Sequence, residues 1–303
     1  MERIKIILIA GLFLILIAIF AGWYLIGLAP KPVSVTQKPE QKKFQQVWGA
    51  YTGNTAESFA AFQKQVGACP NINAVFPDWG TPFPIDLAGP VKANKQTIII
   101  FWEPNITLDQ IISGGADSYI SSFATGAKNY GAPVILVPME EMNGNWDAWN
   151  GTLPGNSPQK IIEAWRHMHD LFLGVANVKW GWDVNNVSVP DTQANAIENY
   201  YPGDAYVDYV GVDGFNFGNP WQSYSEIFSS ALQKLKTYNK PIYIFSMACA
   251  EGPQKPAWIA DAISQIKSDK SIAGWIWFNE NKEQNWLIDS DQESLKVFIS
   301  GIK

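Results

Sequence analysis

Residues 131–149 read GAPVILVPMEEMNGNWDAW, and the other segments of the chain are best understood from this one. Its apolar run, Val134 to Val137, is bounded by turn residues, which is typical of a strand buried on both faces. Two glutamates follow at once, and then Asn143-Gly144 and two tryptophans. Carboxylates here would lie at the carboxyl end of a parallel sheet, where barrel and open-sheet enzymes hold their reactive groups. The alternative is a solvated glutamate pair before an Asn-Gly turn.

The same kind of apolar run recurs after residue 46, in alternation with residues at helical spacing such as Phe59, Phe62 and Val66. Eight strands alternating with helices over about 250 residues predict an α/β fold with a single (β/α)8 TIM barrel. A doubly wound open sheet would normally carry a glycine-rich phosphate loop after its first strand, and Thr52-Gly53-Asn54 is not one. The expected strands cover residues 47–51, 73–77, 97–102, 134–137, 178–182, 208–212, 241–245 and 272–278.

The N-terminal segment has a different character from the rest of the chain. Residues 6–29 carry no charge and follow Arg3 and Lys5, which predicts a transmembrane helix that acts as a signal anchor over residues 1–29. A cleaved signal peptide is the alternative, although Gly27 to Pro30 makes a poor cleavage site. Residues 30–46 are expected to form a linker to a domain over 47–303. That domain would be membrane-anchored on the extracytoplasmic side, or secreted after cleavage.

The bulk composition excludes some classes of partner. The net charge is -6 with no basic stripe, which argues against nucleic acid. The two histidines, His167 and His169, lie two positions apart on an expected helix and do not share a face, so no metal or cofactor is expected. The two cysteines, Cys69 and Cys249, could form a disulfide, but the sequence does not require one.

Aromatic, amide and carboxylate residues recur where the expected strands end, and a barrel gathers all strand ends on one face. Sugars offer an apolar ring face for stacking and hydroxyl groups for hydrogen bonding, so such a set suits a polysaccharide groove. Some tryptophans are expected to be core residues instead, Trp180 and Trp275 among them. The strand-end residues are Trp79, Trp102, Glu103, Glu140, Glu141, Asn143, Trp146, Trp182, Asn185, Asp213, Asn216, Ser246, Trp277 and Asn279.

These residues resemble glycoside hydrolase family 26, whose members are retaining endo-β-glycanases on the (β/α)8 barrel that act on β-mannan, mixed-linkage β-glucan or β-1,3-xylan. The most specific match is the run 141–146, EMNGNW; further matches are Trp182 with Asn185, residues 201–204, 213–214 and 240–242, and residues 275–279. The resemblance implies that Glu141 is the general acid/base. The sugar-binding residues expected from position and resemblance are Trp79, Trp102, Glu103, Asn143, Trp146, Trp182, Asn185, Phe215 and Trp277.

The chain departs from the family pattern at three positions of the expected active site. Ser246 stands where the family has its nucleophilic glutamate, Glu140 where it usually has histidine, and Phe215 where tyrosine is expected. A retaining glycosidase needs a second carboxylate about 5 Å from the first. Two hypotheses follow. Either Glu103, Glu140 or Glu251 supplies that carboxylate, with an inverting mechanism as one option, or the protein is a pseudoenzyme that binds a β-glycan without cutting it.

Overall fold

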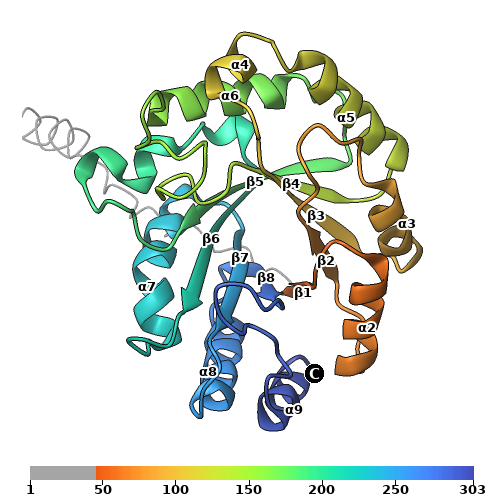
Figure 1. The fold of residues 1–303 in the computed structure, drawn as a ribbon, viewed down its shortest axis with the longest axis vertical. Coiled ribbons are helices and arrows are strands. Elements are labelled where there is room, and N and C mark those ends of the chain that lie inside the picture. Colours follow the sequence, from red (N-terminus) through yellow and green to blue (C-terminus); the bar gives the residue numbers. More distant parts are fainter. Residues whose placement is uncertain (1–45) are drawn as a thin grey trace, which may run out of the picture. The chain divides into compact units, whose positions relative to one another are not determined.

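The computed structural model describes residues 46–303, which form a closed barrel of eight parallel strands in the order β1 to β8 (Figure 1). Each strand pairs with the next one along the chain, and β8 pairs with β1. The predicted (β/α)8 barrel is therefore confirmed for this part of the chain. The strands are β1 (Val47–Tyr51), β2 (Ile72–Val75), β3 (Thr97–Trp102), β4 (Val134–Pro138), β5 (Val178–Asn185), β6 (Tyr209–Asn216), β7 (Ile242–Cys249) and β8 (Ile272–Phe278).

Helices surround the barrel and bury one apolar stripe each against the strands (Figure 1). Helix α2 shows how the local sequence sets an end: the Thr55 hydroxyl accepts the backbone N–H of Ser58, and Gly67 closes the helix in the left-handed conformation. The helices are α2 (Ala56–Val66), α3 (Ile85–Ala93), α4 (Leu108–Ile112), α5 (Asp117–Tyr130), α6 (Pro158–Asp170), α7 (Tyr224–Leu235), α8 (Lys255–Ser268) and α9 (Gln292–Gly301), with short 3₁₀ turns at Gln193–Asn195, Ile197–Tyr200, Asp204–Tyr206 and Lys236–Tyr238.

The inner face of the barrel is set by strand register on β5, β6 and β7. Gly211 lies against the ring of Phe245, where an added Cβ would come within 2.1 Å of the ring. A register shift between Val212 and Asp213 then brings Asp213 opposite Ser246 instead of Phe245. Two consecutive residues of β7, Phe245 and Ser246, therefore point into the barrel, which is the usual effect of a bulge.

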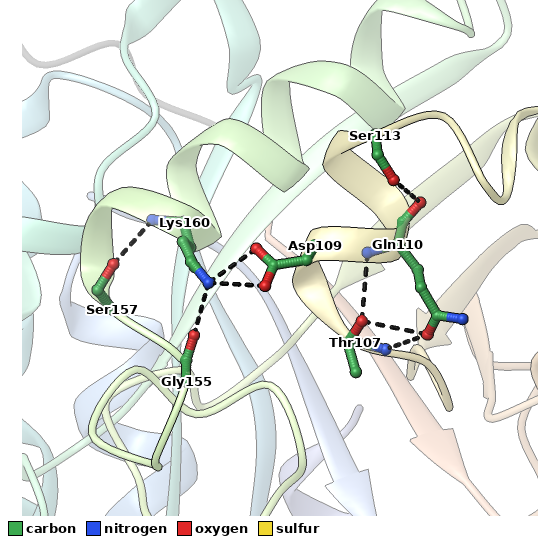
Figure 2. Close-up of polar contacts among 7 residues, drawn as sticks. All are labelled: Thr107, Asp109, Gln110, Ser113, Gly155, Ser157 and Lys160. Carbon is green, nitrogen blue, oxygen red and sulfur yellow. Dashed lines mark hydrogen bonds and ion pairs between the residues drawn. The ribbon is translucent and has the colours of Figure 1, made fainter.

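A small polar cluster ties helix α4 to the start of α6 (Figure 2). The Lys160 ammonium lies 2.7 Å from a carboxylate oxygen of Asp109 and donates to the carbonyl of Gly155 at 2.8 Å. The Ser157 hydroxyl caps α6 by accepting the Lys160 backbone N–H, with Pro158 at the first helical position. Because residues 139–157 connect β4 to α6, this cluster fixes the far end of the segment that follows β4.

The described chain starts at the amino end of the barrel strands. The Gln46 side chain donates to the carbonyls of Ile266 and Asp269, at the carboxyl end of α8.

Cys69 is exposed and Cys249 is buried, and both are free thiols. Among residues 46–303, no helix combines the length and apolar character needed to cross a membrane. The predicted anchor, residues 6–29, lies outside the described residues.

Candidate active site

The two glutamates after β4 are turned apart by an unusual backbone conformation. Met139 and Glu141 have φ values of 52° and 50°, in the left-handed region that L-residues seldom adopt. Glu140, between them, is buried. Since such a backbone costs free energy, it persists where the surroundings hold it, and strain of this kind concentrates at functional sites.

Glu141 is paired with the indole of Trp146. The Trp146 Nε1–H donates to Glu141 Oε2 at 2.9 Å, while 48% of the tryptophan remains exposed. Gly144 makes this possible, because a Cβ there would come within 2.6 Å of the indole ring. Burial, with a smaller contribution from the charge of Asp147, raises the pKa of Glu141 to about 7, against the hydrogen bond from Trp146 and the charge of Lys282. A carboxyl with this pKa can donate a proton near neutral pH.

Buried amides hold the segment that carries Glu141. The Asn143 side chain accepts the Asn185 backbone N–H at 2.8 Å and donates to the Asn185 carbonyl at 3.0 Å. Asn150 Nδ2 donates to the Glu141 carbonyl at 2.9 Å, and Trp149 Nε1 donates to the Glu140 carbonyl at 2.8 Å. Asn143 has no exposed surface and Asn185 is also buried, so these two amides join β4 to β5. They hold the site together. Asn143 has no surface to offer a sugar, which contradicts its predicted role, whereas the sugar-binding role of Asn185 stays a prediction.

Glu140 forms a second carboxyl contact, with Glu103 at the end of β3. Burial raises the pKa of Glu140 well above its ordinary value, and the adjacent charge of Glu103 raises it further. Glu140 therefore favours its protonated form more strongly than a solvent-exposed glutamate does, and it lies beside the exposed Glu103.

A third pair of carboxyl groups, Asp183 on β5 and Asp213 on β6, lies inside the barrel. Asp183 is opposite Gly211 and Asn185 is opposite Asp213, so the two aspartates are diagonal neighbours on the inner face. Burial raises the pKa of both well above the ordinary value, and Glu141 is close enough to raise both further. Asp213 lies opposite Ser246 in the register of β6 and β7.

Within residues 46–303, one cation lies close to Glu141 and the neighbouring acids. Lys282, in the segment after β8, lowers the pKa of Glu141 and of Asp147 and lies 3.1 Å from Glu283. Lys255 anchors this segment. Its side chain is fully buried, and its ammonium donates to the carbonyl of Leu287 at 2.7 Å and to that of Asn285 at 3.3 Å.

Three of the predicted sugar-binding tryptophans lie elsewhere. Trp102, Trp182 and Trp277 have no exposed surface. Alternate residues of a strand point to opposite faces, and these three point outward to the helices. The prediction that they stack on sugar is wrong, because a buried ring has no face to offer. Their ring partners are Phe123 and Phe172 for Trp102, Tyr201 and Tyr238 for Trp182, and Trp258 and Phe298 for Trp277.

The other aromatic residues named in the sequence analysis differ in burial and in the rings they contact. Trp79 is half-buried and packs on Trp102, with ring centroids 4.5 Å apart. Phe215 points inward at the end of β6, 5.7 Å from Phe278. Trp180 and Trp275 are buried, which confirms that they are core residues.

Several residues at this end of the barrel were missed by the sequence reasoning. Phe217 is half exposed and lies 5.2 Å from Trp286, and its position two residues after Phe215 could have indicated it. Asp183 was hidden because it sits inside an apolar strand. Asp147 and Lys282 lie in connecting segments, where spacing gives no indication of what they approach. Burial raises the pKa of Asp147 to about 6.

Comparison with known proteins gives one consistent result. A profile described as Glycosyl hydrolase family 26 matches residues 101–300. Endoglucanase H of Acetivibrio thermocellus is 37% identical over 272 residues, which are 84% of this chain and 30% of that protein. A mannan endo-1,4-beta-mannosidase of Bacillus subtilis is 26% identical over 171 residues, 54% of this chain and 45% of that protein.

A solved structure shows the same fold. A beta-mannanase from Bacteroides ovatus superposes with a TM-score of 0.65 at 16% identity, covering 86% of this chain and 89% of the other. The chain spans less than half the length of the two sequence relatives described above.

Proposed function

Because this chain belongs to glycosyl hydrolase family 26, we propose that its barrel is a glycoside hydrolase that cleaves β-linked polysaccharide with Glu141 as the general acid. The names of the relatives, an endoglucanase and a mannosidase, support β-glucan and β-mannan as substrates. β-1,3-Xylan is the third candidate, from the family resemblance. The single observation that carries the proposal is the carboxyl of Glu141 beside the exposed ring of Trp146.

The environment of Glu141 suits proton donation to a leaving sugar. With a pKa of about 7 the carboxyl is largely protonated at neutral pH or below, so it can transfer its proton to the glycosidic oxygen as the bond to the anomeric carbon breaks. The Trp146 N–H then stabilises the carboxylate that remains, because a hydrogen bond to the charged form favours it. The exposed face of the same indole offers a stacking surface to a sugar ring.

A binding protein without turnover is the second candidate, and Ser246 favours it. The serine is buried at the position where the family nucleophile is expected, and a hydroxyl is not a carboxylate. Under this alternative, Trp146 and Phe217 would hold a β-glycan chain that is never cut.

We also propose that residues 6–29 anchor the protein in a membrane, with the barrel on the extracytoplasmic side, or that the segment is cleaved and the barrel secreted. The uncharged run of residues 6–29 after Arg3 and Lys5 supports the anchor. Gln46 lies at the amino end of the strands, and the carboxyl groups lie at the other end.

Reducing-sugar release by the purified full chain tests the proposal. The substrates are β-mannan, mixed-linkage β-glucan and β-1,3-xylan. Release on one of them is expected, with a loss of roughly a hundredfold or more in Glu141→Gln and none in Glu163→Gln, a surface variant on α6. No release on any substrate, retained binding in affinity gels and activity appearing in Ser246→Glu would establish the binding protein instead.

A further inference from the structure

Gly144 is a point in the run 141–146 where the structure has no room for a side chain. An added Cβ would come within 2.6 Å of Cζ2, 2.7 Å of Cε2 and 2.9 Å of Cη2 of the Trp146 ring. Carbon atoms in ordinary contact lie about 3.5–4.0 Å apart. All three ring atoms belong to the six-membered half of the indole, so this half of the ring lies directly against the Gly144 backbone.

Space, rather than backbone conformation, requires glycine at this position. An Asn-Gly hairpin turn would need glycine for a positive φ. The chain does turn here, because the Gly144 N–H donates to the Glu141 carbonyl at 2.7 Å. However, Gly144 does not belong to the glycines of positive φ, so an L-residue could adopt its backbone. The absence of a Cβ therefore serves the indole and not the turn.

The backbone around Gly144 is held on both sides, whereas the indole is free to move. Besides its bond to Glu141, the Gly144 carbonyl accepts the Thr152 hydroxyl at 3.3 Å, and the preceding Asn143 is fully buried. Trp146, in contrast, is 48% exposed. A methyl group at position 144 would therefore push the indole toward solvent and leave the backbone in place.

A small displacement of the indole is enough to break its contact with the acid. To relieve an overlap at 2.6 Å, the ring has to move by roughly 1 Å. The Trp146 Nε1–H donates to Glu141 Oε2 at 2.9 Å, and a distance of about 3.6 Å no longer makes a hydrogen bond. The ring that supports the Glu141 carboxylate thus keeps its place only while position 144 has no side chain.

We propose that Gly144 is a positioning residue of this site, which holds the Trp146 indole beside the Glu141 carboxyl by letting the ring lie against its backbone. Gly144 acts through Trp146 and not on the substrate. The effect on turnover rests on the proposed glycosidase function, whereas the placement of the ring is a property of the folded chain. The two are therefore tested separately.

The placement of the ring is tested by NMR of the full chain with ¹⁵N-labelled tryptophan. The Trp146 indole resonance is the one that disappears in Trp146→Phe. Because the pKa of Glu141 is about 7, this resonance should titrate with a midpoint near pH 7 in the wild type. In Gly144→Ala it should move toward the position of a solvent-exposed indole and cease to follow Glu141. An unchanged resonance with an unchanged midpoint would overturn the proposal.

The matched control adds the same methyl group where there is space for it. At Gly89 in α3, an added Cβ would meet no heavy atom of residues 46–303 within 4 Å. Gly89→Ala should leave the Trp146 resonance and its titration as they are in the wild type. If Gly144→Ala does not fold, the double variant Gly144→Ala/Trp146→Ala should restore folding, because it removes the ring that the methyl group meets. A double variant that also fails to fold would contradict the proposal.

The effect on turnover is tested by a double-mutant cycle on whichever of β-mannan, mixed-linkage β-glucan or β-1,3-xylan the chain cleaves. Gly144→Ala should lower kcat/KM roughly tenfold or more in the wild type, since a misplacement of about 1 Å is costly to catalysis. In the Trp146→Ala background the same change should cost less than about twofold. Equal losses in the two backgrounds would show that Gly144 does not act through the indole. Absence of cleavage by the wild type would refute the proposed function, and the NMR result would still decide this inference.

Discussion

At the residue scale, the protonation of Glu141 depends on a few named neighbours. Burial is the largest influence on its pKa, and the Trp146 N–H and the Lys282 ammonium act in the opposite direction. The same tryptophan that supports the carboxylate also presents a face to solvent. One side chain thus serves both the acid and the expected sugar contact, and the two roles can be separated by substitution.

Replacing Trp146 by phenylalanine keeps an aromatic face but removes the N–H that Glu141 accepts. Since that hydrogen bond holds the pKa down, its loss raises the pKa of Glu141 above about 7. The proton-donating form then persists to higher pH, and the alkaline limb of the kcat/KM profile moves upward. Profiles of both proteins on the same glycan measure the shift, with Trp79→Phe as the control. A limb that moves to lower pH would refute this account of the pair.

At the element scale, the segments after β4 and β8 are held by buried polar side chains rather than by their own secondary structure. Asn143 joins the β4 segment to β5, and Asn195 Nδ2 donates to the Asn143 carbonyl at 2.8 Å. Trp277 Nε1 donates to the Trp286 carbonyl at 3.1 Å. Trp277 therefore acts on the site indirectly, by fixing the segment that presents Lys282.

Asn143→Ala should destabilise the barrel. The change removes the acceptor of the buried Asn185 N–H and the donor to the Asn185 carbonyl, at a cost of about 2–3 kcal/mol in the free energy of unfolding. Urea denaturation measures it. The neighbouring exposed Asn145→Ala should change stability by less than about 0.5 kcal/mol. Equal effects of the two substitutions would show that the Asn143 contacts are dispensable.

Lys255→Met should loosen the segment after β8. The methionine fills a similar volume but leaves the carbonyls of Leu287 and Asn285 without their donor. Local opening should then become roughly ten times easier, and trypsin should cut after the exposed Lys282 correspondingly faster. Mass spectrometry of a limited digest locates the cut. Lys270→Met serves as the control, and an unchanged cutting rate in Lys255→Met would argue against the anchor.

At the scale of the whole molecule, several buried acids share one end of the barrel and hold protons that an unfolded chain would release. Burial raises the pKa of Asp147 to about 6 and of Glu141 to about 7, and it raises those of Glu140, Asp183 and Asp213 well above the ordinary value. The folded state therefore binds more protons than the unfolded state above roughly pH 4.

Stability should accordingly fall as the pH rises. The sign follows from linkage: where the folded state binds more protons, the free energy of unfolding decreases with pH, here from about pH 4 through pH 6 and 7. A loss of a few kcal/mol between pH 5 and pH 7.5 is expected in urea unfolding. Glu140→Gln, which removes one of these protons, should reduce the slope. Higher stability at pH 7.5 than at pH 5 would contradict the assignment of raised pKa values.

The sequence alone was sufficient for the architecture and for the neighbourhood of the site. Apolar runs alternating with helical patterns define the barrel, and parallel strands running in one direction must bring Glu140, Glu141 and Ser246 to the same end. The core positions of Trp180 and Trp275 were also within its reach.

Only the tertiary structure decided which strand residues face the site. Strands buried on both faces show no alternation of polar and apolar residues, so the sequence does not distinguish the outward Trp182 from the inward Asp183. The register shift after Val212, which places Asp213 beside Ser246, depends on packing between β6 and β7. The left-handed backbone at Glu141 likewise depends on contacts with distant segments, because no local preference of glutamate favours it.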